Sequence, residues 1–142
     1  MFILIFFVIL LFAYDGYRPI RYYNNINREY WNIQKELNDI SEYLIKCPEP
    51  YIYISEDNII KEDIDATINS RESYYILNRE SGKNLLNLGY YKISKENNTL
   101  YFYKYRNIHG TYGIAYLETD ISDSNNTLYK KIDKDWCYFE KR

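Results

Sequence analysis

Residues 23–47 read YNNINREYWNIQKELNDISEYLIKC, and this stretch decides the fold class. Its apolar positions recur at alternating spacings of three and four. They are Tyr23, Ile26, Tyr30, Ile33, Leu37, Ile40, Leu44 and Cys47. Such spacing places them in one stripe along an α-helix. Pro48 and Pro50 end the pattern, because proline does not continue a helix. The sequence therefore predicts an amphipathic helix from about Asn24 to Lys46.

This apolar stripe has two alternative uses, which differ in what covers it. It packs either across a β-sheet of its own domain or against a partner helix in a short coiled coil. Trp31, Tyr43 and Ile45 widen the apolar face beyond the narrow seam of a coiled coil. The stripe also covers only about three heptads, the lower limit for a coiled coil. The sequence therefore favours packing against a sheet.

The C-terminal third of the chain predicts an antiparallel sheet, preceded by one short strand. Runs rich in β-branched and aromatic residues alternate with turns of Asn, Gly and Ser. The expected strands are 51–54, 90–94, 99–106, 111–119, 128–132 and 136–139. Gly113 lies inside one run and indicates a bulge or a close backbone approach. The predicted fold class is α+β, in which one long amphipathic helix packs on an antiparallel β-meander of about four to five strands.

Residues 1–14 (MFILIFFVILLFAY) carry no charge and predict a membrane helix at the N-terminus. A cleaved signal peptide fits less well, because no Lys or Arg precedes Arg18. A fully enclosed core helix is the third alternative. Gly16 and Pro19 are expected to interrupt the helix. The predicted organisation is a single-pass membrane anchor at 1–17, a linker at 18–24 and a single α+β domain at 25–142.

The orientation of this domain depends on two conflicting signals. Arg18, Arg21 and Arg28 follow the apolar segment, and the positive-inside rule then favours a cytoplasmic domain. Cys47 and Cys137 are the only two cysteines, and an even number suits a disulfide in an oxidising compartment. We treat this pair as a candidate disulfide. We accordingly expect the domain on the outer, periplasmic or extracytoplasmic, face of the membrane.

No motif for catalysis, for a metal ion or for a cofactor emerges from the sequence. His109 is the only histidine and lies in an expected turn. Residues 120–126 (DISDSNN) lack the glycine and the closing glutamate of a calcium loop. Residues 83–106 combine lysines with tyrosines, as platforms for single-stranded nucleic acid do, but the net charge of the chain is −2. We therefore expect no enzyme activity, no metal ion, no cofactor and no nucleic acid partner.

These observations predict a membrane-anchored domain that binds another protein, in an inhibitor- or immunity-like role without catalysis. Tyr101, Tyr103 and Tyr105 alternate along one expected strand and form the candidate binding face. Tyrosine suits such a face, because it gives a large contact area with few rotatable bonds. The alternative is a structural component of an envelope assembly that oligomerises through the stripe at 23–47.

The order of an apolar helix, an amphipathic helix and an antiparallel sheet is loosely similar to that of type IV pilin-like proteins. The chain departs from their pattern in having no Gly before the apolar run and no Glu near its start. Gly16 and Pro19 are also expected to break the continuity that a pilin-like helix requires. The sequence assigns no family.

Overall fold

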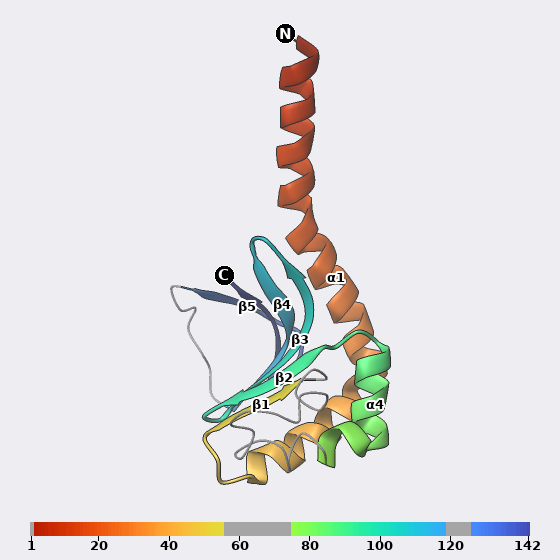
Figure 1. Ribbon diagram of the computed structural model, residues 1–142, viewed down its shortest axis with the longest axis vertical. Helices are drawn as coiled ribbons and strands as arrows, with labels where there is room; N and C mark the ends of the chain where they lie inside the picture. The colour runs from red at the N-terminus through yellow and green to blue at the C-terminus, as the bar shows by residue number, and fades with distance from the viewer. Residues whose placement is uncertain (1, 56–74, 119–125) are drawn as a thin grey trace, which may run out of the picture.

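The computed structural model describes residues 2–55, 75–118 and 126–142, with side chains from residue 20 onward. A long helix, α1 (Phe2–Lys46), and a short helix, α4 (Glu80–Asn87), cover one face of a six-stranded sheet (Figure 1). Every strand pairs antiparallel to its neighbours. The α+β fold class is therefore confirmed.

Helix α1 is one unbroken helix of 45 residues. The expected break at Pro19 is wrong, and residues 18–24, expected to be a linker, are helical. A proline removes one backbone N–H donor and kinks a helix, but flanking turns that are themselves stable carry the helix past it. The N-terminal half projects away from the sheet, and the C-terminal half curves beneath it (Figure 1).

The expected membrane anchor at 1–17 consists of residues whose side chains lie outside the described part of the structure. Among the residues with described side chains, no helix is long and apolar enough to span a bilayer.

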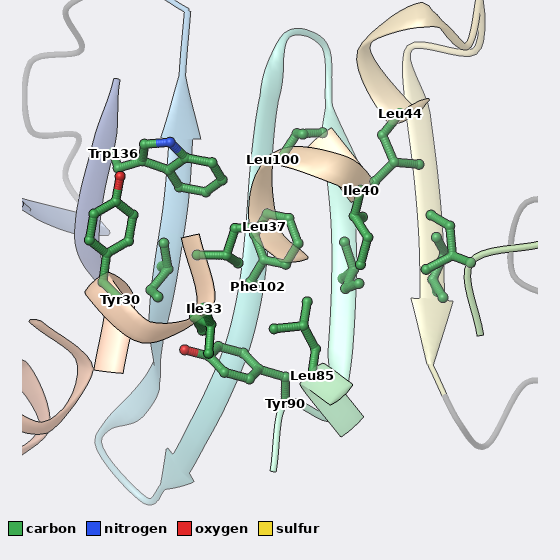
Figure 2. Close-up of a cluster of buried hydrophobic side chains, with 14 of the residues drawn as sticks. Tyr30, Ile33, Leu37, Ile40, Leu44, Leu85, Tyr90, Leu100, Phe102 and Trp136 are labelled. Carbon is green, nitrogen blue, oxygen red and sulfur yellow. The ribbon is translucent and has the colours of Figure 1, made fainter. Parts of the chain in front are cut away.

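The apolar stripe of α1 faces the sheet and forms the main core. Its six central residues are Ile26, Tyr30, Ile33, Leu37, Ile40 and Leu44, and none exposes more than 4 % of its surface. All six belong to one core cluster with Leu100, Phe102 and Trp136 of the sheet, and Figure 2 shows the part of the stripe from Tyr30 to Leu44 lying over the strands. Burial of each such side chain contributes about 1.5–3 kcal/mol, so the stripe is a major source of stability. The expected packing against the chain's own sheet is confirmed.

The residues expected to widen this apolar face behave differently from one another. Tyr43 and Ile45 pack against the core. Trp31 is 57 % exposed and covers only the edge of the Tyr30 ring, at 5.1 Å between centroids. The prediction for Trp31 is therefore wrong, because position 31 lies outside the buried stripe of α1, although buried Tyr30 and Ile33 flank it.

The sheet has the strand order β1-β2-β3-β4-β6-β5. The strands are β1 (Tyr51–Ser55), β2 (Lys92–Glu96), β3 (Thr99–Asn107), β4 (Gly110–Leu117), β5 (Thr127–Lys131) and β6 (Trp136–Lys141). The expected meander holds for the first four strands and fails for the last two, because β6 lies beside β4 and β5 takes the edge. The composition explains this exchange. β6 (WCYFEK) is largely buried, whereas β5 (TLYKK) carries two lysines that suit an edge strand.

A bulge interrupts the pairing of β3 with β4. Tyr103 pairs with Gly113 and Tyr105 with Tyr112, so Lys104 is the extra residue. A Cβ atom at Gly113 would lie 1.9 Å from the carbonyl oxygen of Phe102. The expected bulge or close approach at Gly113 is confirmed in both respects.

The sheet curls strongly, and its face away from α1 is concave (Figure 1). Lys141 ends β6 and Glu96 ends β2, and two strands separate them in the sheet. Their side chains nevertheless form an ion pair of 3.0 Å between Nζ and Oε1. The curl therefore brings distant parts of the sheet together over its own concave face.

Candidate functional site

The expected tyrosine face does not exist as one exposed surface. Tyr101 and Tyr103 lie on the concave face, where they are only 6 % and 2 % exposed. Tyr105 lies on the opposite face and stacks on Tyr22 of α1, with 4.5 Å between ring centroids. The bulge at Lys104 explains the separation, because one extra residue reverses the alternation of side chains along β3.

The concave face is a second small core, made of Tyr101, Tyr103, Ala115, Leu117 and Phe139. The Tyr101 and Tyr129 hydroxyls share a hydrogen bond of 2.7 Å. Lys92 Nζ lies 4.0 Å from the ring centroid of Tyr103, and Lys141 Nζ lies 5.1 Å from that of Tyr101. Burial raises the pKa of both tyrosines. This face is closed by its own side chains, so it offers a partner little surface.

The two cysteines lie on opposite faces of the sheet. Cys47 packs against the core under α1, and Cys137 packs against the concave core. The structure does not join them. The candidate disulfide between Cys47 and Cys137 is therefore wrong, because the sheet itself separates the two thiols.

Two lysines of the expected basic stretch hold α1 in place. Lys95 is 5 % exposed, and its Nζ donates to the carbonyl oxygens of Leu44 and Cys47, at 2.9 and 2.7 Å. These carbonyls lie at the C-terminal end of α1, where a positive charge is favourable. Lys104 Nζ forms an ion pair with Glu29 of α1. Both lysine side chains therefore bind groups of the domain itself.

A cleft of about 690 Å³ opens between α1 and α4. Four asparagines line it, two from each helix: Asn25, Asn32, Asn84 and Asn87. Arg28 lies between the first two on α1 and is exposed. Each asparagine amide both donates and accepts hydrogen bonds, so the cleft presents several groups of both kinds within one concavity.

Two carboxylates line this cleft, and each already binds another side chain of the domain. Glu36 Oε1 accepts a hydrogen bond of 3.2 Å from Asn84 Nδ2. Glu29 Oε2 forms an ion pair with Lys104 Nζ, while Glu29 Oε1 is buried and has no hydrogen-bond partner within the described residues. Burial, and then the charge of Glu29, raise the pKa of Tyr90 well above its usual range. Among the charged residues that line the cleft, Arg28 is therefore the exposed one, while Glu29 and Glu36 are half-buried.

This cleft was not predicted from the sequence, although its α1 side leaves a signal. Residues 25, 28, 32 and 36 follow spacings of three and four, which place them in one polar stripe beside the apolar one. The α4 side leaves none, because residues 71–88 follow neither a clear helical nor a clear strand period.

The remaining expectations concern metal ions and catalysis. Across the described parts of the chain, no group of three His, Cys, Asp or Glu residues could hold a metal ion. His109 lies in the turn between β3 and β4, as expected, while residues 120–125 of the DISDSNN stretch fall outside the described residues. Comparison of the chain with protein-family models, with curated proteins and with solved structures found no match.

Proposed function

We propose that the protein is a membrane-anchored domain that binds another protein, without catalysis. The proposed single-pass anchor is the segment at 1–17, whose first fourteen residues are uncharged. Helix α1 supports this proposal, because it continues from that segment into the core without a break. An anchor of this kind holds the folded domain close to the membrane surface.

The proposed binding surface is the cleft between α1 and α4. The observation that carries this proposal is the set of four asparagines that line one concavity. An extended peptide presents one donor and one acceptor at each residue, which is the chemistry that these amides match. Leu88 lies in the lining, is 41 % exposed and offers an apolar contact. The exposed charge of Arg28 favours an acidic residue on the bound segment.

The side of the membrane on which the domain lies is also a proposal. The external orientation depended on a disulfide, and Cys47 and Cys137 lie on opposite faces of the sheet. Arg18, Arg21 and Arg28 then remain as the orientation signal and favour a cytoplasmic domain. A membrane-impermeant maleimide tests this. Labelling only after cell lysis supports the cytoplasmic side, and labelling in intact cells supports the outer side.

A photo-crosslinking amino acid at Asn32 or at Asn87 tests the cleft in intact cells. We expect both positions to capture the same protein, because both line the cleft. Asn38 is the matched control, since it is exposed on α1 but lies outside the cleft. The substitution Arg28→Glu should abolish capture at Asn32. Equal capture at Asn38, or capture that survives Arg28→Glu, would contradict the proposal.

A second candidate function is a structural component of an envelope assembly. The stripe at 23–47 is buried in the chain's own core, so it leaves no surface for oligomerisation. The unbroken α1 favours a different route, in which the projecting N-terminal halves of several copies pack together (Figure 1). It also removes one of the departures from the pilin-like pattern. Light scattering of the full chain in mild detergent separates the two candidates, because a monomer would exclude this one.

A further inference from the structure

The hairpin formed by β3 and β4 ends in an exposed apolar residue. Ile108 lies in its turn and is 92 % exposed. Arg106 and His109, on either side of it, are also exposed. A single exposed apolar side chain is ordinary on a protein surface. Its significance depends on where the turn lies and on how firmly it is held.

The turn is held by its own hydrogen bonds. Asn107 Oδ1 accepts from the backbone N–H of His109, at 2.8 Å, and from that of Gly110, at 3.2 Å. The Tyr112 hydroxyl donates to the same oxygen at 3.3 Å. These contacts keep Ile108 directed outward instead of allowing it to fold back onto the sheet.

The turn lies at the end of the domain from which α1 projects (Figure 1). The ring of Tyr22 lies 4.5 Å from that of Tyr105 and 4.9 Å from that of Tyr112, which fixes α1 against the hairpin just below the turn. Two further residues of β3 rise about 7 Å, equivalent to about five residues of helix. The turn is therefore level with α1 near Arg18, where the uncharged segment has ended.

The charge at this end of the domain is also suited to a membrane surface. Arg21 and Arg106 are both exposed. Arg142 lies nearby, with its Cα 3.3 Å from the place of a Cβ at Gly110, but its Nε is already paired with Glu140. Exposed arginines near a bilayer are attracted to anionic headgroups.

We propose that the β3–β4 turn is a second membrane contact, in which Ile108 inserts among the headgroups of an anionic bilayer and Arg21 and Arg106 pair with lipid phosphates. This inference rests on the proposed anchor at 1–17. A single helical anchor leaves the domain free to rotate about the helix axis. A second contact removes that freedom and gives the cleft between α1 and α4 a fixed direction along the membrane.

The substitution Ile108→Trp tests this contact in the full chain reconstituted into vesicles of phosphatidylcholine and phosphatidylglycerol. We expect its added fluorescence, after subtraction of the unsubstituted protein, to shift to shorter wavelength and to be quenched by brominated lipid. The matched control is Asn98→Trp, an exposed position in the β2–β3 turn at the opposite end of the sheet. We expect neither effect there. Adding Arg106→Glu should reduce the quenching of Ile108→Trp.

Flotation of the same samples separates the two proposals. A chain that floats with the vesicles while Ile108→Trp is quenched no more than Asn98→Trp retains its anchor, and that result overturns the second contact alone. A chain that does not float overturns the anchor and the second contact together. Quenching of Ile108→Trp that is equal on pure phosphatidylcholine vesicles would overturn the role of anionic lipid.

Discussion

The two faces of the sheet are buried in different ways. One face is covered by α1, whose stripe of residues is remote in sequence from the strands that it covers. The other face is covered by the sheet itself, which curls until Lys141 and Glu96 meet across Tyr101 and Tyr103. The spacing along a helix therefore reveals which face of the helix is buried, whereas alternation along a strand does not reveal whether the second face of the sheet stays open.

Alkaline pH should destabilise both faces together, and this is the largest effect that we expect. Burial and, to a smaller extent, the hydrogen bond to Asp133 raise the pKa of Tyr30 to about 12. Burial also raises the pKa of Tyr101. The folded state therefore favours the protonated phenols. The contribution of these phenols to the free energy of unfolding is fully present below about pH 10 and is lost as the pH rises through about 12. Urea unfolding with increasing pH should give a falling midpoint. A urea midpoint that stays constant as the pH rises from about 10 through about 12 would contradict this.

The helix-covered face should show the largest effect of a single substitution. Leu37 is fully buried, so Leu37→Ala should lower the free energy of unfolding by about 2–5 kcal/mol. Asn38→Ala is the matched control on the adjacent exposed position and should change it by less than about 0.5 kcal/mol. Urea unfolding measures both. Equal effects would mean that α1 does not cover the sheet.

The bulge that separates the two faces should tolerate no side chain at Gly113. A Cβ there meets the Phe102 carbonyl oxygen at 1.9 Å and the Phe139 ring at 2.9 Å. We expect Gly113→Ala to lower the free energy of unfolding by about 1–3 kcal/mol. Amide exchange should also rise along β3 and β4. An unchanged unfolding midpoint would show that the two strands lie further apart than described.

The concave face should respond modestly to loss of its tyrosine hydrogen bond. We expect Tyr101→Phe to lower the free energy of unfolding by about 0.5–1.5 kcal/mol, because it removes the bond to Tyr129 and leaves the ring in place. Tyr129→Phe removes the same bond, so the double variant should lose less stability than the sum of the two single variants. Urea unfolding of the three variants measures this coupling. Strict additivity would mean that the two hydroxyls do not meet.

The sequence predicted the parts of the fold that depend on local spacing. The stripe from Ile26 to Leu44 and most of the strands follow from periods that neighbouring residues reveal. Gly113 also indicated the bulge, since a glycine inside a strand often marks a bulge or a close backbone approach. The exchange of β5 and β6 left a signal in the two lysines of β5, which suit an edge strand, but the assumption of sequential hairpins overlooked it.

The candidate site depended on features that no local pattern carries. The separation of Tyr105 from Tyr101 follows from one extra residue at Lys104, and the burial of Tyr101 follows from the curl of the whole sheet. The continuity of α1 through Pro19 depends on the stability of the turns on either side. The cleft also depends on the position of α4, and residues 71–88, which contain this helix, show no clear period that would predict it.

The central claim is that the concave face is a closed core, so that a partner binds elsewhere. Nitration of tyrosines in the native full-length protein, followed by peptide mapping, tests it most directly. We expect rapid nitration of Tyr51, Tyr53 and Tyr75, which are 62 %, 43 % and 43 % exposed. We expect protection of Tyr101 and Tyr103 until the protein unfolds. Nitration of these two at the rate of Tyr51 would contradict the claim and restore the concave face as a binding surface.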